Sequence, residues 1–320
     1  MTLHIRGLAI DPPIALAPMV GLSHSALRSL VAEFGGAGLF FSEMLSAKRL
    51  PSENEKCSPF LIRTEIEKPL FYQIYASEHV SLTSALEKLS TFGAQGIDLN
   101  LGCPAPKLKK IKAGQFLFEK RGAVEKIVRK LRALSDLPLS VKIRIGIKPD
   151  QLHLTKVCQM LANEGVDLIT IHARLDHEKF CRKPRWEILQ DATSKVTIPI
   201  FANGGIFTTE DAKECLNKSG AAGIMIGRGA AVRPWICKDI ARQCFDYRAS
   251  HPSWSEKDVF MRFIALLEER FPPERRLGRL KQFAHYFASS FPFGHQFAFR
   301  IQNSATMEHA AREALQFFNQ

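Results

Sequence analysis

Apolar, β-rich runs alternate with segments of helical periodicity along the first two thirds of the chain. Between these runs, apolar residues recur at helical spacing, as in His24–Phe34, Ser81–Phe92 and Ala123–Leu134. The first run ends in Ala17-Pro18-Met19 instead of a glycine-rich turn, which disfavours a doubly wound dinucleotide-binding sheet. Eight strand–helix units in about 230 residues are typical of a TIM (β/α)8 barrel. The strand-like runs are Ile14–Met19, Gly38–Met44, Leu70–Ala76, Gly96–Gly102, Leu139–Gly146, Leu168–Arg174, Ile198–Gly205 and Gly223–Gly229.

The strand pattern stops after Trp235. The remaining chain has helical patterns only, with a proline-rich break at Phe271-Pro272-Pro273 and clear helical spacing over Leu277–Ser289 and Ala305–Phe318. We therefore expect an α/β fold in which a TIM-barrel catalytic domain, residues 1–240, precedes a small all-helical domain, residues 241–320.

Composition narrows the class of protein. The chain has 320 residues, of which 46% are hydrophobic and 24% charged, as in ordinary globular domains. It has no uncharged apolar run of about 18 residues and no signal-peptide pattern, so we expect neither a membrane span nor secretion. Its seven cysteines include no CxxC pair and no zinc-like spacing, so we expect no metal, no disulfide framework and a cytoplasmic location.

The charge points to a polyanionic partner. Lys and Arg number 44 against 32 Asp and Glu, a net charge of +12 that favours nucleic acid over the alternative of a basic surface kept for solubility. The excess is concentrated between Ala105 and Arg132, where ten basic residues face only Glu119 and Glu125. Those basic residues are Lys107, Lys109, Lys110, Lys112, Lys120, Arg121, Lys126, Arg129, Lys130 and Arg132.

Polar side chains also gather at the predicted strand ends, where a TIM barrel has its active site. Strand alternation puts Asp98 with Asn100 on one face of the fourth strand, Lys142 with Arg144 on the fifth, and His172 with Arg174 on the sixth. Charges within apolar strands are costly unless they are paired or meet a ligand, so this convergence predicts an anionic ligand. Glycine turns after the last two strands, at residues 203–205 and 227–229, are suited to a phosphate group.

Six motifs, taken in order, resemble those of the dihydrouridine synthases, flavoenzymes that reduce uridine in RNA. The resemblance covers residues 14–236, weakens over Arg279-Leu280-Lys281-Gln282, and is closest to the bacterial enzymes that act on transfer RNA. The motifs are Leu16-Ala17-Pro18-Met19, Gln73, Asp98-Leu99-Asn100-Leu101-Gly102-Cys103-Pro104, Ser140-Val141-Lys142-Ile143-Arg144-Ile145-Gly146, Ala202-Asn203-Gly204-Gly205-Ile206 and Met225-Ile226-Gly227-Arg228-Gly229.

The resemblance implies FMN as the cofactor and NADPH as its hydride donor. It implies that Cys103 is the catalytic residue and that Asn100 lies beside the target base. The implied cofactor-binding residues are Pro18, Met19 and Val20 along the flavin ring, Gln73 at its polar edge, Lys142 near N1, His172 against the cofactor, and Asn203, Gly204, Gly205, Gly227 and Arg228 at the phosphate end.

Elementary chemistry agrees with two of these roles. A cation of the Lys142 type stabilises a negatively charged flavin. An unperturbed thiol is mostly protonated at pH 7 and can donate the proton that reduction of a double bond requires. Without the motif, Cys103 would be read as a small buried hydrophobe. Cys181 is a second candidate acid, and the other cysteines are interpreted as structural.

A stacked uridine must be flipped out to react, and phosphate contacts have to offset that cost. The residues that we expect at the RNA are Asn100, Lys107, Lys109, Lys110, Lys112 and Arg174 from the barrel, with Arg275, Arg276, Arg279 and Lys281 from the helical domain. We expect a monomer with an RNA partner, transfer RNA first and ribosomal RNA as the alternative. A flavin barrel that reduces a small molecule and a non-catalytic RNA-binding module are the competing hypotheses.

The chain departs from the family pattern at positions that would meet RNA or the flavin edge. The departures are Ser23-His24 in the first loop, the run after His172 that reaches Phe180, Gln115-Phe116, and Arg233. They affect the predicted RNA substrate more than the predicted chemistry.

Overall fold

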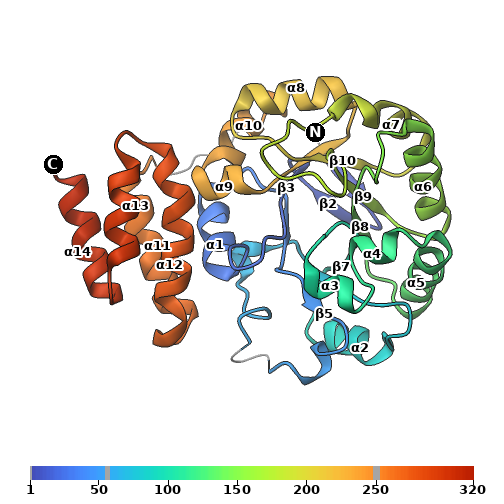
Figure 1. Ribbon diagram of the computed structural model, residues 1–320, viewed down its shortest axis with the longest axis horizontal. Helices are drawn as coiled ribbons and strands as arrows, with labels where there is room; N and C mark the ends of the chain where they lie inside the picture. The colour runs from blue at the N-terminus through green and yellow to red at the C-terminus, as the bar shows by residue number, and fades with distance from the viewer. Residues whose placement is uncertain (1, 55–57, 248–252) are drawn as a thin grey trace.

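The computed structural model describes residues 2–54, 58–247 and 253–320. Cys57, one of the cysteines interpreted as structural, lies outside these residues. The described chain forms a barrel ringed by helices, with a group of helices beside it (Figure 1).

Eight parallel strands close into a ring, which confirms the predicted TIM barrel. β3 pairs with β4 on one side and with β11 on the other, and β4 pairs with β6, so that no edge is left open. The barrel strands are β3 (Ile14–Leu16), β4 (Leu39–Phe41), β6 (Leu70–Tyr75), β7 (Gly96–Asn100), β8 (Leu139–Arg144), β9 (Leu168–His172), β10 (Ile200–Asn203) and β11 (Gly223–Ile226).

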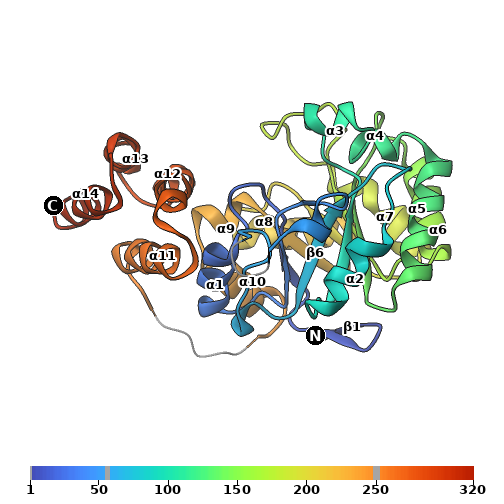
Figure 2. The ribbon, with the colours of Figure 1, turned by 90° about the horizontal axis from the view of Figure 1, so that it is seen from below.

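Helices surround this ring, most of them on its outside and two short ones, in the segment after β7, at its C-terminal mouth (Figure 2). They include each helix predicted for this region, with bounds shifted by at most two residues. They are α1 (Ser25–Phe34), α2 (Thr83–Thr91), α3 (Pro106–Lys110), α4 (Gln115–Phe118), α5 (Arg121–Leu134), α6 (Gln151–Asn163), α7 (Gln190–Lys195), α8 (Thr209–Ser219), α9 (Arg228–Val232) and α10 (Ile236–Cys244). Single 3-10 turns lie at Leu50–Ser52, Glu65–Glu67 and Trp186–Leu189.

The strands end earlier than the apolar runs that predict them. The run Ile14–Met19, for example, contains a strand only over Ile14–Leu16, and Ile198–Gly205 only over Ile200–Asn203. The remaining residues leave the sheet as loops at the C-terminal mouth. An apolar run therefore marks a strand together with the loop that follows it.

The N-terminal end of the barrel is closed by a hairpin that the sequence analysis did not predict. β1 (Leu3–Ile5) and β2 (Leu8–Ile10) pair antiparallel across Arg6-Gly7, both with positive φ as a two-residue hairpin turn requires. Ile5 and Ile10 are buried against interior residues of the barrel such as Phe71 and Phe201. Figure 2 shows this hairpin at the opposite end of the barrel from α3 and α4. Another short strand, β5 (Leu45–Ser46), pairs with β6.

A buried ion pair fixes the loop that follows β3. Arg28 and Glu67 are fully buried, and Arg28 Nε lies 2.7 Å from the Glu67 carboxylate. Arg28 also donates to the main-chain oxygens of Ser23 and Ile62. Since Ser23 ends the loop that begins at Pro18, this charge pair anchors one wall of the barrel mouth.

The C-terminal helices form a compact group with a phenylalanine core. They are α11 (Glu256–Arg270), α12 (Arg276–Phe287), α13 (Gly294–Asn303) and α14 (Met307–Phe318), with 3-10 turns at Pro273–Arg275 and Ala288–Ser290. Four phenylalanines of this core are fully buried: Phe260 and Phe283 stack on Phe287, and Phe297 meets Phe260 edge-on. α12 and α14 agree with the predicted helices. The predicted boundary between the two domains, after residue 240, falls inside the barrel-side helix α10. That boundary stays a prediction.

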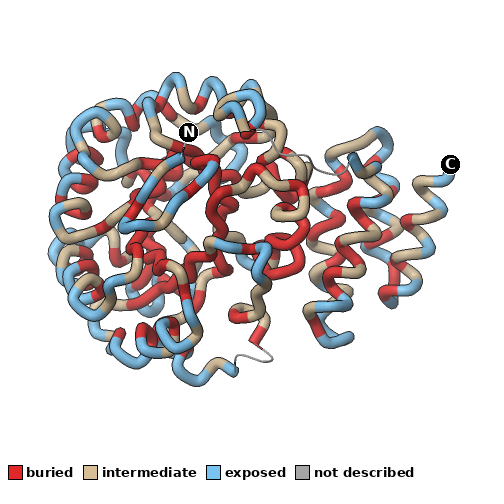
Figure 3. The backbone as a smooth tube through the Cα atoms, turned by 180° about the vertical axis from the view of Figure 1, so that it is seen from behind, coloured by how far each residue is buried: buried red, intermediate tan, exposed pale blue. Residues whose placement is uncertain are grey.

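This helical group packs on α1 of the barrel. Arg262 of α11 forms a two-pronged ion pair with Glu33 of α1. His24, one of the departures from the family pattern, is buried between the rings of Phe263 and Phe271. Figure 3 shows that buried positions continue from the barrel into this junction.

Among the described residues, no helix is both long and apolar enough to cross a membrane. Over the same ranges, no group of three or more His, Cys, Asp and Glu side chains could hold a metal ion.

We predict that Arg28→Met lowers the free energy of unfolding by about 3–5 kcal/mol, because it leaves the Glu67 carboxylate buried without its partner. Urea denaturation measures this change. Lys218→Met, which breaks the exposed Lys218–Glu214 pair, is the control and should leave the denaturation midpoint unchanged. Equal midpoints for the two variants would contradict the role given to Arg28.

Candidate active site at the barrel mouth

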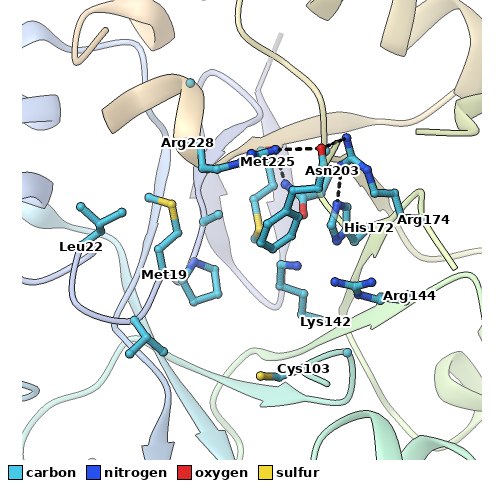
Figure 4. Close-up of a pocket in the computed structure, with 18 of the residues that line it drawn as sticks. Met19, Leu22, Cys103, Lys142, Arg144, His172, Arg174, Asn203, Met225 and Arg228 are labelled. Atoms are coloured by element: carbon cyan, nitrogen blue, oxygen red, sulfur yellow. Dashed lines mark hydrogen bonds between the residues drawn. The ribbon is translucent and has the colours of Figure 1, made fainter. Parts of the chain in front are cut away.

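The C-terminal mouth of the barrel holds a cavity of about 310 Å³. Figure 4 shows its side chains converging from several strands and loops. Its lining includes every residue predicted as catalytic or cofactor-binding: Pro18, Met19, Val20, Gln73, Cys103, Lys142, His172, Asn203, Gly204, Gly205, Gly227 and Arg228.

Strand register brings the polar residues together. Gln73 of β6 is level with Asp98 of β7, and Asn100 of β7 is level with Lys142 of β8. His172 of β9 is level with Arg144 on one side and with Asn203 on the other. The cavity is thus lined by a continuous belt of polar side chains, as the alternation pattern predicts.

One side of the cavity is strongly cationic. Arg174 Nη1 lies 2.9 Å from His172 Nε2. Because a guanidinium group only donates, Nε2 accepts and the ring proton sits on Nδ1. Burial, and then the cations around it, hold the pKa of His172 well below its ordinary value. His172 is therefore neutral at pH 7, and the arginines and Lys142 carry the charge.

Asp98, which is buried, and Lys142, which is half buried at the cavity, carry opposite charges that influence each other. Burial lowers the pKa of Lys142 to about 8, although the Asp98 charge opposes that shift. Burial likewise raises the pKa of Asp98 to about 6, against hydrogen bonds from Ser140 and Gln73 and the charge of Lys142. Both groups are mostly charged at pH 7. Within the described parts of the chain, the Lys142 ammonium donates no hydrogen bond to a protein group, so it can serve a ligand.

The turn after β10 is built for close approach of a ligand. Gly204 has φ +109°, and a Cβ there would come within 2.5 Å of the His172 ring. Gly205 has φ +76°, which also favours glycine. The main chain of this turn therefore lies open to the cavity, next to Arg228.

Cys103 lies in the loop after β7 and is half buried. Its N–H donates to Asn100 Oδ1 at 3.1 Å, and its carbonyl accepts from the Gln115 N–H at 3.2 Å. The loop is thus held on both sides, with the thiol at the cavity. Cys181, the second candidate acid, is exposed and is not among the lining residues.

The structure distributes the predicted RNA residues over several places. Lys107, Lys109, Lys110 and Lys112 are exposed on or just after α3, beside the Cys103 loop. Asn100 and Arg174 instead line the cavity and are buried.

In the helical domain, Arg275 is exposed and Lys281 half buried. Arg276 donates to the main-chain oxygens of Phe271 and Glu268. Arg279 lies over the Phe271 ring at 4.4 Å. Arg276 and Arg279 are thus also part of the packing of this domain.

Several lining residues were not singled out from the sequence. Arg144, noted only as a neighbour of Lys142, lines the cavity. Phe180 lies at the rim, half exposed, with the Arg228 guanidinium 4.6 Å above its ring. Gln282 and Tyr286 reach the cavity from α12. An aromatic residue inside an otherwise polar loop, and the weak match around Lys281-Gln282, are the signals that could have found them.

The fold is a TIM barrel, and its C-terminal mouth is a cationic cavity with glycine turns that are suited to a phosphate group. Two solved structures share this fold: histamine dehydrogenase from Rhizobium sp. 4-9, with a TM-score of 0.56 and 9% identity over 83% of this chain, and a 2-naphthoyl-CoA reductase, with a TM-score of 0.55 and 12% identity over 75%. The match covers 50% and 51% of those chains, so it supports the architecture alone.

Sequence comparison identifies the family. The family model for dihydrouridine synthases matches residues 15–320. A tRNA-dihydrouridine(16) synthase of Aquipseudomonas alcaligenes is 31% identical over 288 residues, 87% of this chain and 91% of the relative. A probable tRNA-dihydrouridine synthase of Rhodobacter capsulatus is 32% identical over 249 residues, 77% and 76% of the two chains. This chain belongs to the dihydrouridine synthase family.

The cofactor of this family is a flavin, and the cavity has the features that such a group needs. The Gly204 turn packs its main chain directly against the His172 ring at the cavity wall, and Arg228 supplies positive charge to the same cavity. The Lys142 ammonium on β8 and the Gln73 amide on β6 lie on either side of β7 and line the same cavity. The residues present therefore fit a flavin with a phosphate tail.

We predict that Gly204→Ala weakens flavin binding by about tenfold or more, because alanine is strained at this φ and its Cβ displaces His172. Titration of the flavin-free protein with FMN measures the affinity. Gly278→Ala on α12, where a Cβ meets nothing within 4 Å, is the matched control and should bind flavin normally. Equal affinity of both variants would remove the turn from the binding site.

Proposed function

We propose that this protein is an FMN-dependent tRNA-dihydrouridine synthase that uses NADPH. The observation that carries the proposal is the juxtaposition of a flavin-suited cavity, the Cys103 thiol at its edge, and an exposed basic helix directly after that thiol. A small-molecule reductase needs only the first of these features.

FMN is the form of flavin that the cavity favours. The anion-binding groups lie in the loops after β10 and β11, the common phosphate site of this fold. Gln73 and Lys142 would hold the ring, Pro18, Met19 and Val20 would lie along it, and Asn203 to Gly205 with Gly227 and Arg228 would hold the phosphate. When bound, FMN supplies the hydride that is added to one carbon of the uracil 5,6 double bond.

Cys103 supplies the proton for the other carbon. Its backbone is fixed through Asn100, and its half-buried side chain lies at the cavity. General acid catalysis by a group held in this way contributes typically about 10²–10⁴-fold to a rate.

The basic residues hold the RNA from two sides. Lys107, Lys109, Lys110 and Lys112 would contact phosphates next to the flipped uridine, and Arg275 and Lys281, with Arg279, would contact them from the helical domain. Asn100 and Arg174 would shape the cavity that receives the base. The protein would act as a monomer in the cytoplasm, where transfer RNA is found.

Position 16 of tRNA is the first candidate for the modified uridine. The similarity to the enzyme named for that position spans 288 residues, more than the predicted barrel, and so includes part of the helical domain. Mapping dihydrouridine by mass spectrometry in tRNA and ribosomal RNA, with and without the gene, tests the assignment. Loss at position 16 supports it, loss at another tRNA position would move the assignment there, and loss confined to ribosomal RNA would replace it by the alternative substrate.

We predict that Cys103→Ala separates the two halves of the reaction. The variant should keep its flavin absorbance and lose it with NADPH at nearly the parent rate. Recovery of the absorbance on adding RNA should be slower by about 10²–10⁴-fold, because the proton donor is missing. Cys181→Ala is the control and should behave like the parent. If only Cys181→Ala is slow, the loop after β9 carries the proton.

We also predict that changing Lys107, Lys109 and Lys110 to Ala weakens RNA binding. The salt dependence should lose about one unit of slope for each phosphate contact removed. A matched triple change of Lys195, Lys213 and Lys218, exposed on the outer helices α7 and α8, removes the same charge and should alter the slope little. Identical slopes for the two variants would assign the α3 lysines to plain surface.

A further inference from the structure

A continuous chain of hydrogen bonds runs from a buried carboxylate to the Cys103 loop. Gln73 Nε2 donates to Asp98 Oδ2 at 2.6 Å, and Asn100 Nδ2 donates to Gln73 Oε1 at 2.8 Å. Asn100 Oδ1 then accepts from the main-chain N–H groups of Gly102, at 3.3 Å, and Cys103, at 3.1 Å. Asp98 and Gln73 are almost wholly inaccessible to solvent, and Asn100 is 8% exposed, so water does not replace these bonds.

Both ends of this chain have a fixed polarity. An ionised carboxylate only accepts hydrogen bonds, and a main-chain N–H only donates. Between those ends, Gln73 must turn its NH₂ group to Asp98 and its oxygen to Asn100. Asn100 must in turn present its NH₂ group to Gln73 and its oxygen to the loop. One orientation of each amide satisfies every bond, and the opposite orientation of either one sets two like groups against each other.

We propose that Asp98 is a positioning residue: the acceptor oxygen that it presents to Gln73, together with the loop N–H groups at the other end, sets the direction of the Gln73 and Asn100 amides and so holds the Cys103 loop at the cavity. Ser140 completes the arrangement, since its hydroxyl donates to Asp98 Oδ1 at 2.5 Å. Only the catalytic importance of this loop rests on the proposed function. The direction of the chain is a property of the protein without RNA or NADPH.

The same carboxylate links the acid loop to the cofactor side of the cavity. Two residues that are expected at the flavin interact with Asp98. Gln73 donates a hydrogen bond to its carboxylate, and Lys142 is attracted by its charge. A change at Asp98 would therefore reach both sides of the reacting base without touching it.

An exchange of Asp and Asn between positions 98 and 100 tests the direction. In Asn100→Asp alone, carboxylates lie on both sides of Gln73, whose single NH₂ group can face only one of them. In the double variant Asp98→Asn/Asn100→Asp, the chain is satisfied in reverse. The new amide at position 98 donates to Gln73, Gln73 donates to the new carboxylate at position 100, and that carboxylate accepts from the loop. In Asp98→Asn alone, the Ser140 hydroxyl can accept from the new amide, so the original direction survives.

The readout is the rate at which iodoacetamide modifies Cys103, with excess FMN present and exposed Cys181 as the internal reference. Buried Cys158, Cys215 and Cys237 do not compete, since burial raises the pKa of each to about 12. Asn100→Asp should modify about tenfold or more faster than the parent, because an unsatisfied buried acceptor loosens the loop. Asp98→Asn and the double variant should each stay within about threefold of the parent.

Rescue by the second substitution is the decisive result, because a merely structural need for the two native residues would make the double variant worse than either single one. If Asn100→Asp does not fold, recovery of folded protein in the double variant is the same positive outcome. A double variant at least as reactive or as unstable as Asn100→Asp would overturn the proposal. Since the assay needs no turnover, failure of the proposed uridine reduction would leave its result unchanged.

Discussion

Closure of the eight parallel strands into one ring is the constraint on which the site depends. Pairing of β3 with β11 and of β4 with β6 leaves no sheet edge, so the main-chain groups of the barrel are satisfied by one another. The N-terminal end is filled by the β1–β2 hairpin, and polar side chains are left to the C-terminal mouth. Register then decides which of them are neighbours, and it places Gln73 beside Asp98 and Asn100 beside Lys142.

Electrostatics at the mouth follow from that geometry. Cations gather on the side of β8, β9 and the turn after β11, where burial first, and then these charges, lower the pKa of His172 and keep its imidazole neutral. The negative charge of buried Asp98 favours the charged form of Lys142. The Lys142 ammonium therefore stays charged at the cavity. Helix α12 extends this design to the helical domain: Gln282 lines the cavity and its Nε2 donates to the Val20 carbonyl at 3.2 Å. Gly21, whose φ of +75° favours glycine, lies directly against the end of the Gln282 side chain.

The barrel and the gathering of polar residues and glycine turns at its mouth could be predicted from the sequence because each signal is local. A strand, its polar end and the glycine after it lie within a few residues of one another. Closure of the ring then brings the ends of the different strands together. The N-terminal hairpin was missed because its strands are only three residues long and are stabilised by the interior of the barrel. The sequence also does not show which arginines are used in packing. In the structure, the Arg276 guanidinium donates to main-chain oxygens, whereas Arg275 is exposed. Phe180, Gln282 and Tyr286 reach the cavity only through tertiary packing.

We expect this barrel to reduce uridine within folded RNA and not in a free nucleotide. Reoxidation of the NADPH-reduced protein under anaerobic conditions tests it most directly, with unmodified tRNA transcript, the same transcript already containing dihydrouridine, and uridine monophosphate as acceptors. Flavin absorbance should return rapidly with the unmodified transcript and not with the other two acceptors. Equal or faster recovery with the free nucleotide would contradict it, because the basic surfaces beside Cys103 and on the helical domain would then contribute nothing to the choice of substrate.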